Sequence, residues 1–167
     1  MNYIPEIQKK IVLVKQDFSV CLQTWKNQNK KIVFTNGCFD ILHRGHADYL
    51  AKAASLGDVL ILGLNTDKSI QRIKGTSRPI VDEYSRAFLL ASFFFVDAVI
   101  LFDEDTPLDL INLIQPDILV KGSDYKEENI VGADVVRAKG GSIMTIDLVD
   151  GFSTTAIIKK ITEQQKM

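Results

Sequence analysis

Short apolar runs alternate with amphipathic stretches along most of the chain. Five runs have the composition of buried parallel strands, at residues 31–35, 58–64, 96–102, 118–120 and 142–146. Between and after them, apolar residues recur at helical spacing at about residues 49–56, 84–95, 107–114, 131–138 and 153–161. This alternation predicts one α/β domain of the Rossmann-like type, a five-stranded parallel sheet in the order 3-2-1-4-5 with helices on both faces.

The first 30 residues do not follow this alternation. Within residues 16–28, Phe18, Leu22 and Trp25 form an apolar stripe on an otherwise polar helix. We interpret residues 1–30 as an N-terminal extension with one helix, and residues 31–167 as the functional domain. The stripe can pack on the domain or on a second subunit, and we expect a homo-oligomer, most simply a dimer. A substrate role for Trp25 is the alternative.

Composition and charge exclude several classes of protein. Apolar residues make up 46% of the chain and charged residues 25%, with a formal net charge of −1 and no polybasic or acidic block, so we expect neither nucleic acid nor a membrane as a partner. The longest apolar stretch, residues 87–100, is interrupted by Ser92 and Asp97, and no export signal precedes it. Cys21 and Cys38 have neither metal-type nor redox-type spacing, which favours a reducing cytoplasm.

The strongest candidate for chemistry is a pair of histidines. His43 and His46, the only two in the chain, stand three residues apart with Gly45 between them, where the first core strand turns into a helix. Residues three apart share one helix face. The first turn of a helix offers unpaired amides and the positive end of the helix dipole, and both favour the binding of phosphate. Gly45 lets a nucleotide approach the backbone closely. A zinc site is the competing interpretation, but zinc usually takes at least three protein ligands and only Cys38 stands nearby.

The segment around this pair, residues 35–46 (TNGCFDILHRGH), closely resembles the HxGH signature of the cytidylyltransferase-like nucleotidyltransferases. Residues 120–125 (VKGSDY), 150–155 (DGFSTT) and the pattern at 74–79 further resemble the heptose 1-phosphate adenylyltransferases of lipopolysaccharide precursor synthesis. The resemblance implies transfer of AMP from ATP to D-glycero-β-D-manno-heptose 1-phosphate, giving ADP-heptose and pyrophosphate, with Mg²⁺ accompanying ATP. It also implies a separate sugar kinase upstream in the pathway.

The resemblance assigns roles residue by residue. His43 and His46 would stabilise charge on the α- and β-phosphates, and Lys74 joins them as a catalytic candidate. The expected nucleotide-binding residues are Thr35, Asn36, Gly37, Phe39, Gly45, Asn65, Asp67, Gly122, Ser153, Thr154 and Thr155. The expected acceptor-binding residues are Asp40, Arg78 and Asp124, and no residue is expected to hold a resident metal. Turn capping by the aspartates and helix capping by the Ser-Thr-Thr segment are the structural alternatives.

Two other functions stay open at this point. A glycerol 3-phosphate cytidylyltransferase shares the fold, the histidines and the Ser-Thr-Thr segment. That family typically carries an arginine where this chain has residues 148–150 (LVD), and an acidic, tryptophan-containing segment where this chain has residues 121–125. A catalytically silent nucleotide-sensing domain is the alternative of a different class, and binding of ATP without pyrophosphate release would identify it.

Overall fold

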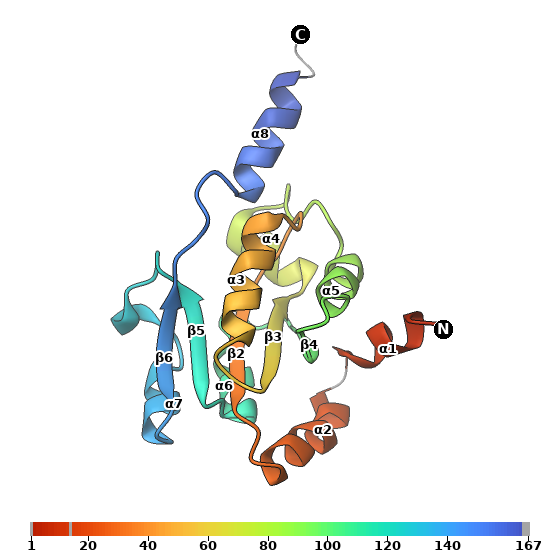
Figure 1. Cartoon of the computed structure of the whole chain (residues 1–167). Helices are drawn as coiled ribbons and strands as arrows, with labels where there is room; N and C mark the ends of the chain where they lie inside the picture. Colours follow the sequence, from red (N-terminus) through yellow and green to blue (C-terminus); the bar gives the residue numbers. More distant parts are fainter. Residues whose placement is uncertain (1, 14, 165–167) are drawn as a thin grey trace.

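The computed structural model describes residues 2–13 and 15–164. Its six strands form one sheet, in which every neighbouring pair is parallel, in the order β1-β4-β3-β2-β5-β6 (Figure 1). The strands are β1 (Ile11–Val12), β2 (Ile32–Gly37), β3 (Val59–Asn65), β4 (Ala98–Phe102), β5 (Ile118–Gly122) and β6 (Ser142–Ile146).

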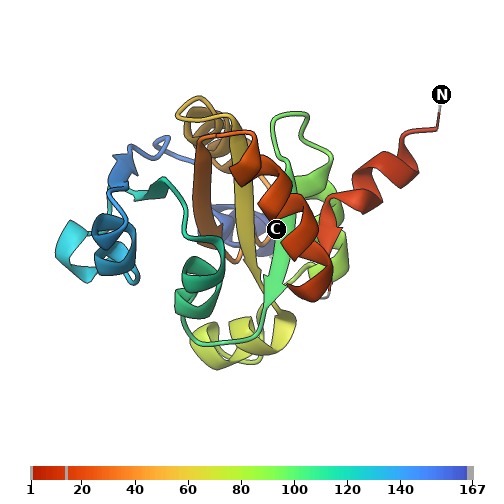
Figure 2. The same ribbon diagram turned by 90° about the horizontal axis from the view of Figure 1, so that it is seen from below.

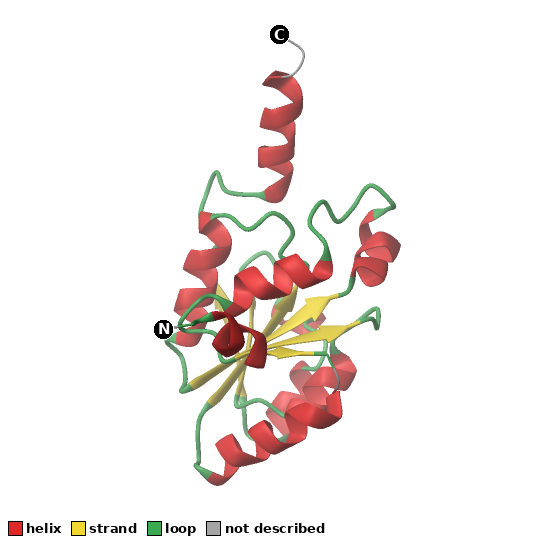
Figure 3. Ribbon diagram, turned by 90° about the vertical axis from the view of Figure 1, so that its right-hand side faces the viewer, coloured by secondary structure: helices red, strands yellow, loops and turns green. Residues whose placement is uncertain are grey.

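Helices cover both faces of this sheet (Figure 3). Since consecutive side chains of a strand point to opposite faces, Ile32 and Phe34 of β2 pack in one apolar cluster and Val33 in the other. Helices α2, α6 and α7 complete the first cluster, and α3 and α5 complete the second. The helical elements are α1 (Ile4–Lys9), α2 (Lys15–Asn27), α3 (Arg44–Ala54), α4 (Asp67–Lys74), α5 (Glu83–Ala91), α6 (Leu108–Ile114), η1 (Glu127–Asn129), α7 (Ala133–Ala138) and α8 (Thr154–Gln164).

The expectation of a five-stranded sheet is wrong in its number of strands. The additional strand, β1, comes from the N-terminal extension and pairs with β4, with Ile11 opposite Val99 and Val12 opposite Ile100. The other strands follow in the order β4-β3-β2-β5-β6. A strand of two residues is too short to show the alternation that identifies a strand in sequence, which needs roughly four to eight residues.

Two helices near the sheet differ in how well the sequence indicated them. Helix α2 lies against the domain (Figure 2). Its apolar stripe is used there, because Phe18 and Leu22 are buried in the first cluster. Helix α4 was not among the helical stretches predicted from the sequence. Its N-cap is Thr66, whose hydroxyl accepts the N–H of Ser69 at 3.2 Å, and Ile70 anchors it in the interior.

The strand order creates a switch point between β2 and β5. After β2 the chain places β3 and β4 on one side, and it then returns to place β5 and β6 on the other. Parallel sheets of this kind bind ligands outside the carboxyl ends of the two strands that flank such a point. Helix α8 stands beyond this edge of the sheet and has no buried residue (Figure 1). No helix formed by the described residues is long and apolar enough to cross a membrane.

Candidate active site

A cleft of about 800 Å³ lies at the carboxyl edge of the sheet, over the switch point. It is walled by the loop between β2 and α3, the end of α4, the loop after β5 and the start of α8. The predicted site residues that line it are Asn36, Gly37, Phe39, Asp40, His43, Gly45, His46, Asn65, Lys74, Arg78, Gly122, Asp124, Ser153, Thr154 and Thr155.

Two predicted nucleotide-binding residues lie outside the lining of this cleft. Thr35 is fully buried, and its hydroxyl shares a 2.8 Å hydrogen bond with the hydroxyl of Tyr49. Asp67 begins α4 and forms an ion pair with Arg86, with 2.7 Å between Oδ1 and Nη2. Both residues therefore contact the elements that carry the cleft, and neither faces its interior in this structure.

The two histidines form a stacked pair inside the cleft. Their ring centroids are 3.8 Å apart and the ring planes are inclined by 18°. His43 is the N-cap of α3, so its extended backbone turns the side chain toward His46 on the first turn of the helix. A Cβ atom at Gly45 would lie 3.0 Å from the His43 ring and 3.1 Å from Cβ of Phe152. The glycine therefore leaves the space that the His43 ring occupies in the stack.

Burial keeps both histidines neutral. It lowers the pKa of His43, and burial, with smaller contributions from the neighbouring His43 and Lys74, lowers the pKa of His46 to about 4. Nδ1 of each ring is buried and has no hydrogen-bond partner among the described residues. A neutral imidazole carries one N–H donor and one acceptor nitrogen, so each ring keeps hydrogen-bonding capacity for a ligand.

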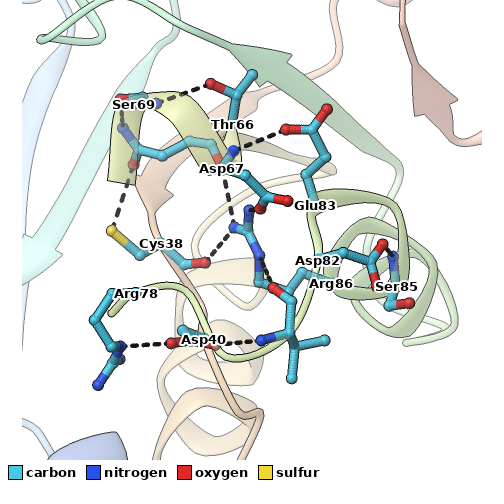
Figure 4. Close-up of polar contacts among 12 residues, drawn as sticks. Cys38, Asp40, Thr66, Asp67, Ser69, Arg78, Asp82, Glu83, Ser85 and Arg86 are labelled. Atoms are coloured by element: carbon cyan, nitrogen blue, oxygen red, sulfur yellow. Dashed lines mark hydrogen bonds and ion pairs between the residues drawn. The ribbon is translucent and has the colours of Figure 1, made fainter. Parts of the chain in front are cut away.

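Asp40, a predicted acceptor-binding residue, makes its hydrogen bonds and its ion pair within the protein. Its buried carboxylate accepts the backbone N–H groups of Ile80 and Val81, each at 3.0 Å. It also forms a 2.7 Å ion pair with Nε of Arg78 (Figure 4). Burial alone would raise the pKa of Asp40, but these hydrogen bonds and the Arg78 charge outweigh it and hold the pKa below its usual value. The carboxylate thus holds the segment at residues 78–81 against the loop after β2. Binding of the acceptor by Asp40 stays a prediction.

Arg86 joins four segments behind the cleft. Its guanidinium, in a residue only 1% exposed, donates to the carbonyl oxygens of Cys38 (2.6 Å), Asn65 (3.0 Å) and Val81 (2.8 Å), and to the Asp67 carboxylate (Figure 4). These partners belong to the loop after β2, the end of β3, the segment before α5, and the start of α4. The backbone that presents His43 and Lys74 is therefore tied together by one buried cation.

The Ser-Thr-Thr segment divides its hydroxyl groups among three environments. Ser153 caps α8, since its hydroxyl accepts the N–H of Ala156 at 3.1 Å. The hydroxyl of Thr154 donates to the backbone carbonyl of Asp40, which ties α8 to the loop after β2. The exposed hydroxyl of Thr155 makes no hydrogen bond with any described residue. Of the three, Thr155 is therefore the one whose hydroxyl is available to a ligand without loss of an internal contact.

Lys121 lines the cleft and was not among the predicted site residues. It is 8% exposed, its ammonium donates to Oδ1 of Asn36, and Nζ lies 5.4 Å from the centroid of the Tyr125 ring. Burial lowers the pKa of Lys121 to about 8. The signal in the sequence was a lysine inside an otherwise apolar buried run, residues 118–122.

The chain is similar to a known protein family and to two curated relatives described below. Residues 34–160 match the family model described as cytidylyltransferase-like. The bifunctional protein HldE of Campylobacter jejuni subsp. jejuni is 55% identical over 160 residues, which cover 96% of this chain and 33% of that protein. The HldE of Syntrophotalea carbinolica is 52% identical over 159 residues, covering 95% and 32%. The chain thus spans about a third of the length of the curated relatives it matches.

Two solved structures have a similar fold. The lipopolysaccharide core biosynthesis protein from Thermoplasma volcanium is 31% identical, with a TM-score of 0.57, and the match covers 72% of this chain and 97% of that one. A pantoate-β-alanine ligase from Francisella tularensis, crystallised with an ATP ligand and β-alanine, has a TM-score of 0.59 over 94% of this chain and 79% of that one. At 16% identity, the ligase is evidence for the fold alone.

Proposed function

The chain belongs to the cytidylyltransferase-like family, and on that premise we propose that it transfers AMP from ATP to D-glycero-β-D-manno-heptose 1-phosphate, releasing pyrophosphate and forming ADP-heptose. The observation that carries the proposal is the stacked pair His43 and His46 in one cleft with Lys74 and the start of α8. Identity of 52% and 55% to two HldE proteins supports the choice of substrate within the family.

The chemistry of this transfer suits a cleft with neutral histidines. The nucleophile is an oxygen of the sugar phosphate, which is already deprotonated at neutral pH because the second pKa of a phosphate monoester is about 6. This oxygen forms a bond to the α-phosphorus of ATP, the bond from that phosphorus to the oxygen bridging to the β-phosphate breaks, and pyrophosphate leaves with the electron pair. No general base is required, in keeping with a His46 pKa of about 4. The protein must supply positioning and charge stabilisation.

Each part of the cleft contributes a different donor in this proposal. The ring N–H groups of His43 and His46 would donate to phosphate oxygens as negative charge shifts toward the leaving pyrophosphate. Lys74, the last residue of α4, would supply positive charge from the β3 side. Thr155 and the unpaired amides at the start of α8 would contact the triphosphate. Arg78, with guanidinium N–H groups beyond those facing Asp40, would bind the acceptor.

A divalent cation, which we propose is Mg²⁺, accompanies ATP in this scheme. The described residues contain no group of three or more His, Cys, Asp or Glu side chains that could hold a metal ion. Mg²⁺ commonly keeps several water ligands and binds through substrate phosphates, so the triphosphate can bring it without a protein cage. When bound, it would neutralise part of the triphosphate charge.

A pyrophosphate-release assay tests the proposed function. With Mg²⁺, ATP and D-glycero-β-D-manno-heptose 1-phosphate the protein should release pyrophosphate, and with CTP and glycerol 3-phosphate it should not. The opposite preference would contradict the heptose assignment and leave the family unaffected. ATP binding without pyrophosphate release, with either acceptor, would instead favour the nucleotide-sensing alternative.

Two associated proposals concern partners. The acceptor must be made by phosphorylation of a sugar at its anomeric oxygen, so we propose a sugar kinase upstream. We also propose a homo-oligomer, most simply a dimer, which light scattering of the purified protein checks directly.

A further inference from the structure

The residue that the proposed mechanism leaves unused is a lysine at the end of a buried strand. Every residue of β5 is buried, and Lys121 is its only charged member. It stands near the carboxyl end of β5, next to β2, and therefore at the switch point of the sheet. The histidines and Lys74 reach the cleft from the β2 and β3 side, whereas Lys121 reaches it from the β5 side.

The surroundings of Lys121 do not neutralise its charge. Its hydrogen-bond acceptor, Oδ1 of Asn36, is neutral, and its other close neighbour is the Tyr125 ring. Asp124 favours the charged form from a distance, but no carboxylate among the described residues forms an ion pair with Lys121. Buried charges in proteins are usually paired, because an unpaired one loses its hydration without compensation. An anion from outside the chain would complete this environment.

We propose that the ammonium of Lys121 binds a phosphate group of a substrate at the junction of β2 and β5, an inference that rests on the nucleotidyl transfer proposed above. Lys121 faces the same cleft as the stacked histidines, and Asn36, its hydrogen-bond partner, lines that cleft too. A phosphate held there would be contacted from both sides of the switch point. The phosphate can belong to the nucleotide or to the acceptor sugar, and the same lysine chemistry serves either.

The test compares Lys121→Met and Lys121→Arg with the wild type. Lys126→Met is the matched control, because it removes an exposed lysine from the loop that follows β5. Isothermal titration at pH 7 measures the affinity for two probes separately, α,β-methylene-ATP with Mg²⁺ and D-glycero-β-D-manno-heptose 1-phosphate. Both probes bind without turnover, so an absence of pyrophosphate release in the standard assay counts against the proposed function alone.

Lys121→Met should weaken binding of at least one probe by about 10- to 100-fold, the range of a lost hydrogen bond to a charged group. Weakening for the ATP analogue alone assigns Lys121 to the nucleotide phosphates, and weakening for the sugar phosphate alone assigns it to the acceptor. The Lys126→Met control should bind both probes as the wild type does. Unchanged affinity of Lys121→Met for both probes would overturn the proposal.

A pH series separates phosphate binding from a purely structural link between β2 and β5. Above pH 8 the Lys121 amine loses its proton, so wild-type affinity should fall between pH 7 and pH 9, whereas Lys121→Arg should stay charged and keep its affinity. The pKa values of His46, about 4, and Tyr49, about 12, lie outside this window. Asp124 and Tyr125 face the lysine unchanged in both proteins, so the difference between the two profiles isolates residue 121.

Thermal melting gives the complementary result. Removal of an unpaired buried charge should leave the melting temperature of Lys121→Met equal to or above that of the wild type. If Lys121→Met melts several degrees lower and Lys121→Arg fails to restore binding, Lys121 is a structural link and the proposal fails.

Discussion

Two groups of buried or partly buried polar side chains lie at the same edge of the sheet and differ in how their hydrogen bonds are satisfied. In the closed network, the Asp40 carboxylate accepts backbone N–H groups and forms an ion pair with Arg78, and the Arg86 guanidinium donates to backbone carbonyl oxygens and to the Asp67 carboxylate. In the open cluster, Lys121 is buried and His43 and His46 are partly buried, but the buried Nδ1 atoms of both histidines have no hydrogen-bond partner and Lys121 has no anionic partner, within the part of the chain that the structure describes.

Burial of a polar residue near a cleft therefore does not by itself indicate a ligand contact. A side chain whose partners are all supplied by the chain holds the backbone in place, and binding of a substrate would require it to give up those bonds. A side chain with unused hydrogen-bonding capacity can bind the substrate without breaking an internal contact. Substitutions in the closed network should therefore reduce stability, whereas substitutions in the open cluster should reduce binding or turnover.

The largest expected effect on stability is at Arg86. Arg86→Met removes the donor shared by three carbonyl groups and leaves the Asp67 carboxylate without its partner, which should lower the free energy of unfolding by about 3–5 kcal/mol. Urea denaturation at pH 7 measures it. The control, Arg72→Met, removes an exposed arginine from ion pairs with Asp103 and Asp105 and should leave the midpoint nearly unchanged. Equal shifts in the two variants would contradict a closed network.

His46 gives the largest expected effect on turnover. His46→Ala should reduce pyrophosphate release by at least about 100-fold, the effect of one lost donor to developing negative charge, equivalent to roughly 2.7 kcal/mol of activation free energy. The same variant should lose less stability than Arg86→Met, because no hydrogen bond to Nδ1 is broken. Steady-state kinetics and urea denaturation of one preparation measure both quantities. Near-normal turnover would remove His46 from the mechanism.

At Asp40 the expected effect is intermediate and depends on pH. Asp40→Asn removes the charge that faces Arg78 and should cost about 2 kcal/mol of unfolding free energy at pH 7. Because folding depresses the pKa of Asp40 below 3.8, the carboxylate stabilises the folded state above about pH 4, and this contribution is lost as the pH falls through the depressed value. Denaturation curves from pH 7 to pH 3 should therefore decline less steeply for the variant.

A half-exposed carboxylate provides the control for Asp40. Asp48→Asn removes an ion pair with Lys52, four residues further along α3, and should change stability by at most about 0.5 kcal/mol. If Asp40→Asn is as mild as this control, Asp40 is not held by the closed network, and its predicted role in acceptor binding gains support.

The smallest expected effects distinguish the roles of the Ser153 and Thr155 hydroxyl groups in the Ser-Thr-Thr segment. Ser153→Ala removes the N-cap of α8 and should speed amide hydrogen exchange in that helix by about fivefold, which corresponds to about 1 kcal/mol. Thr155→Ala should not speed exchange, because its hydroxyl has no partner among the described residues. It should instead weaken binding of the ATP analogue. Faster exchange in both variants would mean that Thr155 also supports the helix.

The regular parts of the fold were accessible from sequence, and the irregular parts were not. The sequence shows β3, buried at all seven positions, as a continuous apolar run, and it shows α3 as apolar residues at helical spacing, so both signals are local. Strand β1 was missed because its two residues pair only after β4 has been brought beside them. Helix α4 was missed because its eight residues are too few to show helical periodicity clearly, although Thr66 supplied a recognisable cap.

The alternation of strands and helices, and the position of His43, Gly45 and His46 at the start of one helix, are predictable from the sequence, because both features are local. Which polar groups find hydrogen-bond partners within the chain depends on the tertiary structure, because those partners are remote in the sequence. Asp40 accepts hydrogen bonds from backbone N–H groups 40 and 41 residues away, and Lys121 donates to Asn36, which is 85 residues away. Hydrogen-bond satisfaction depends on those distant contacts, and no local pattern of residues encodes it.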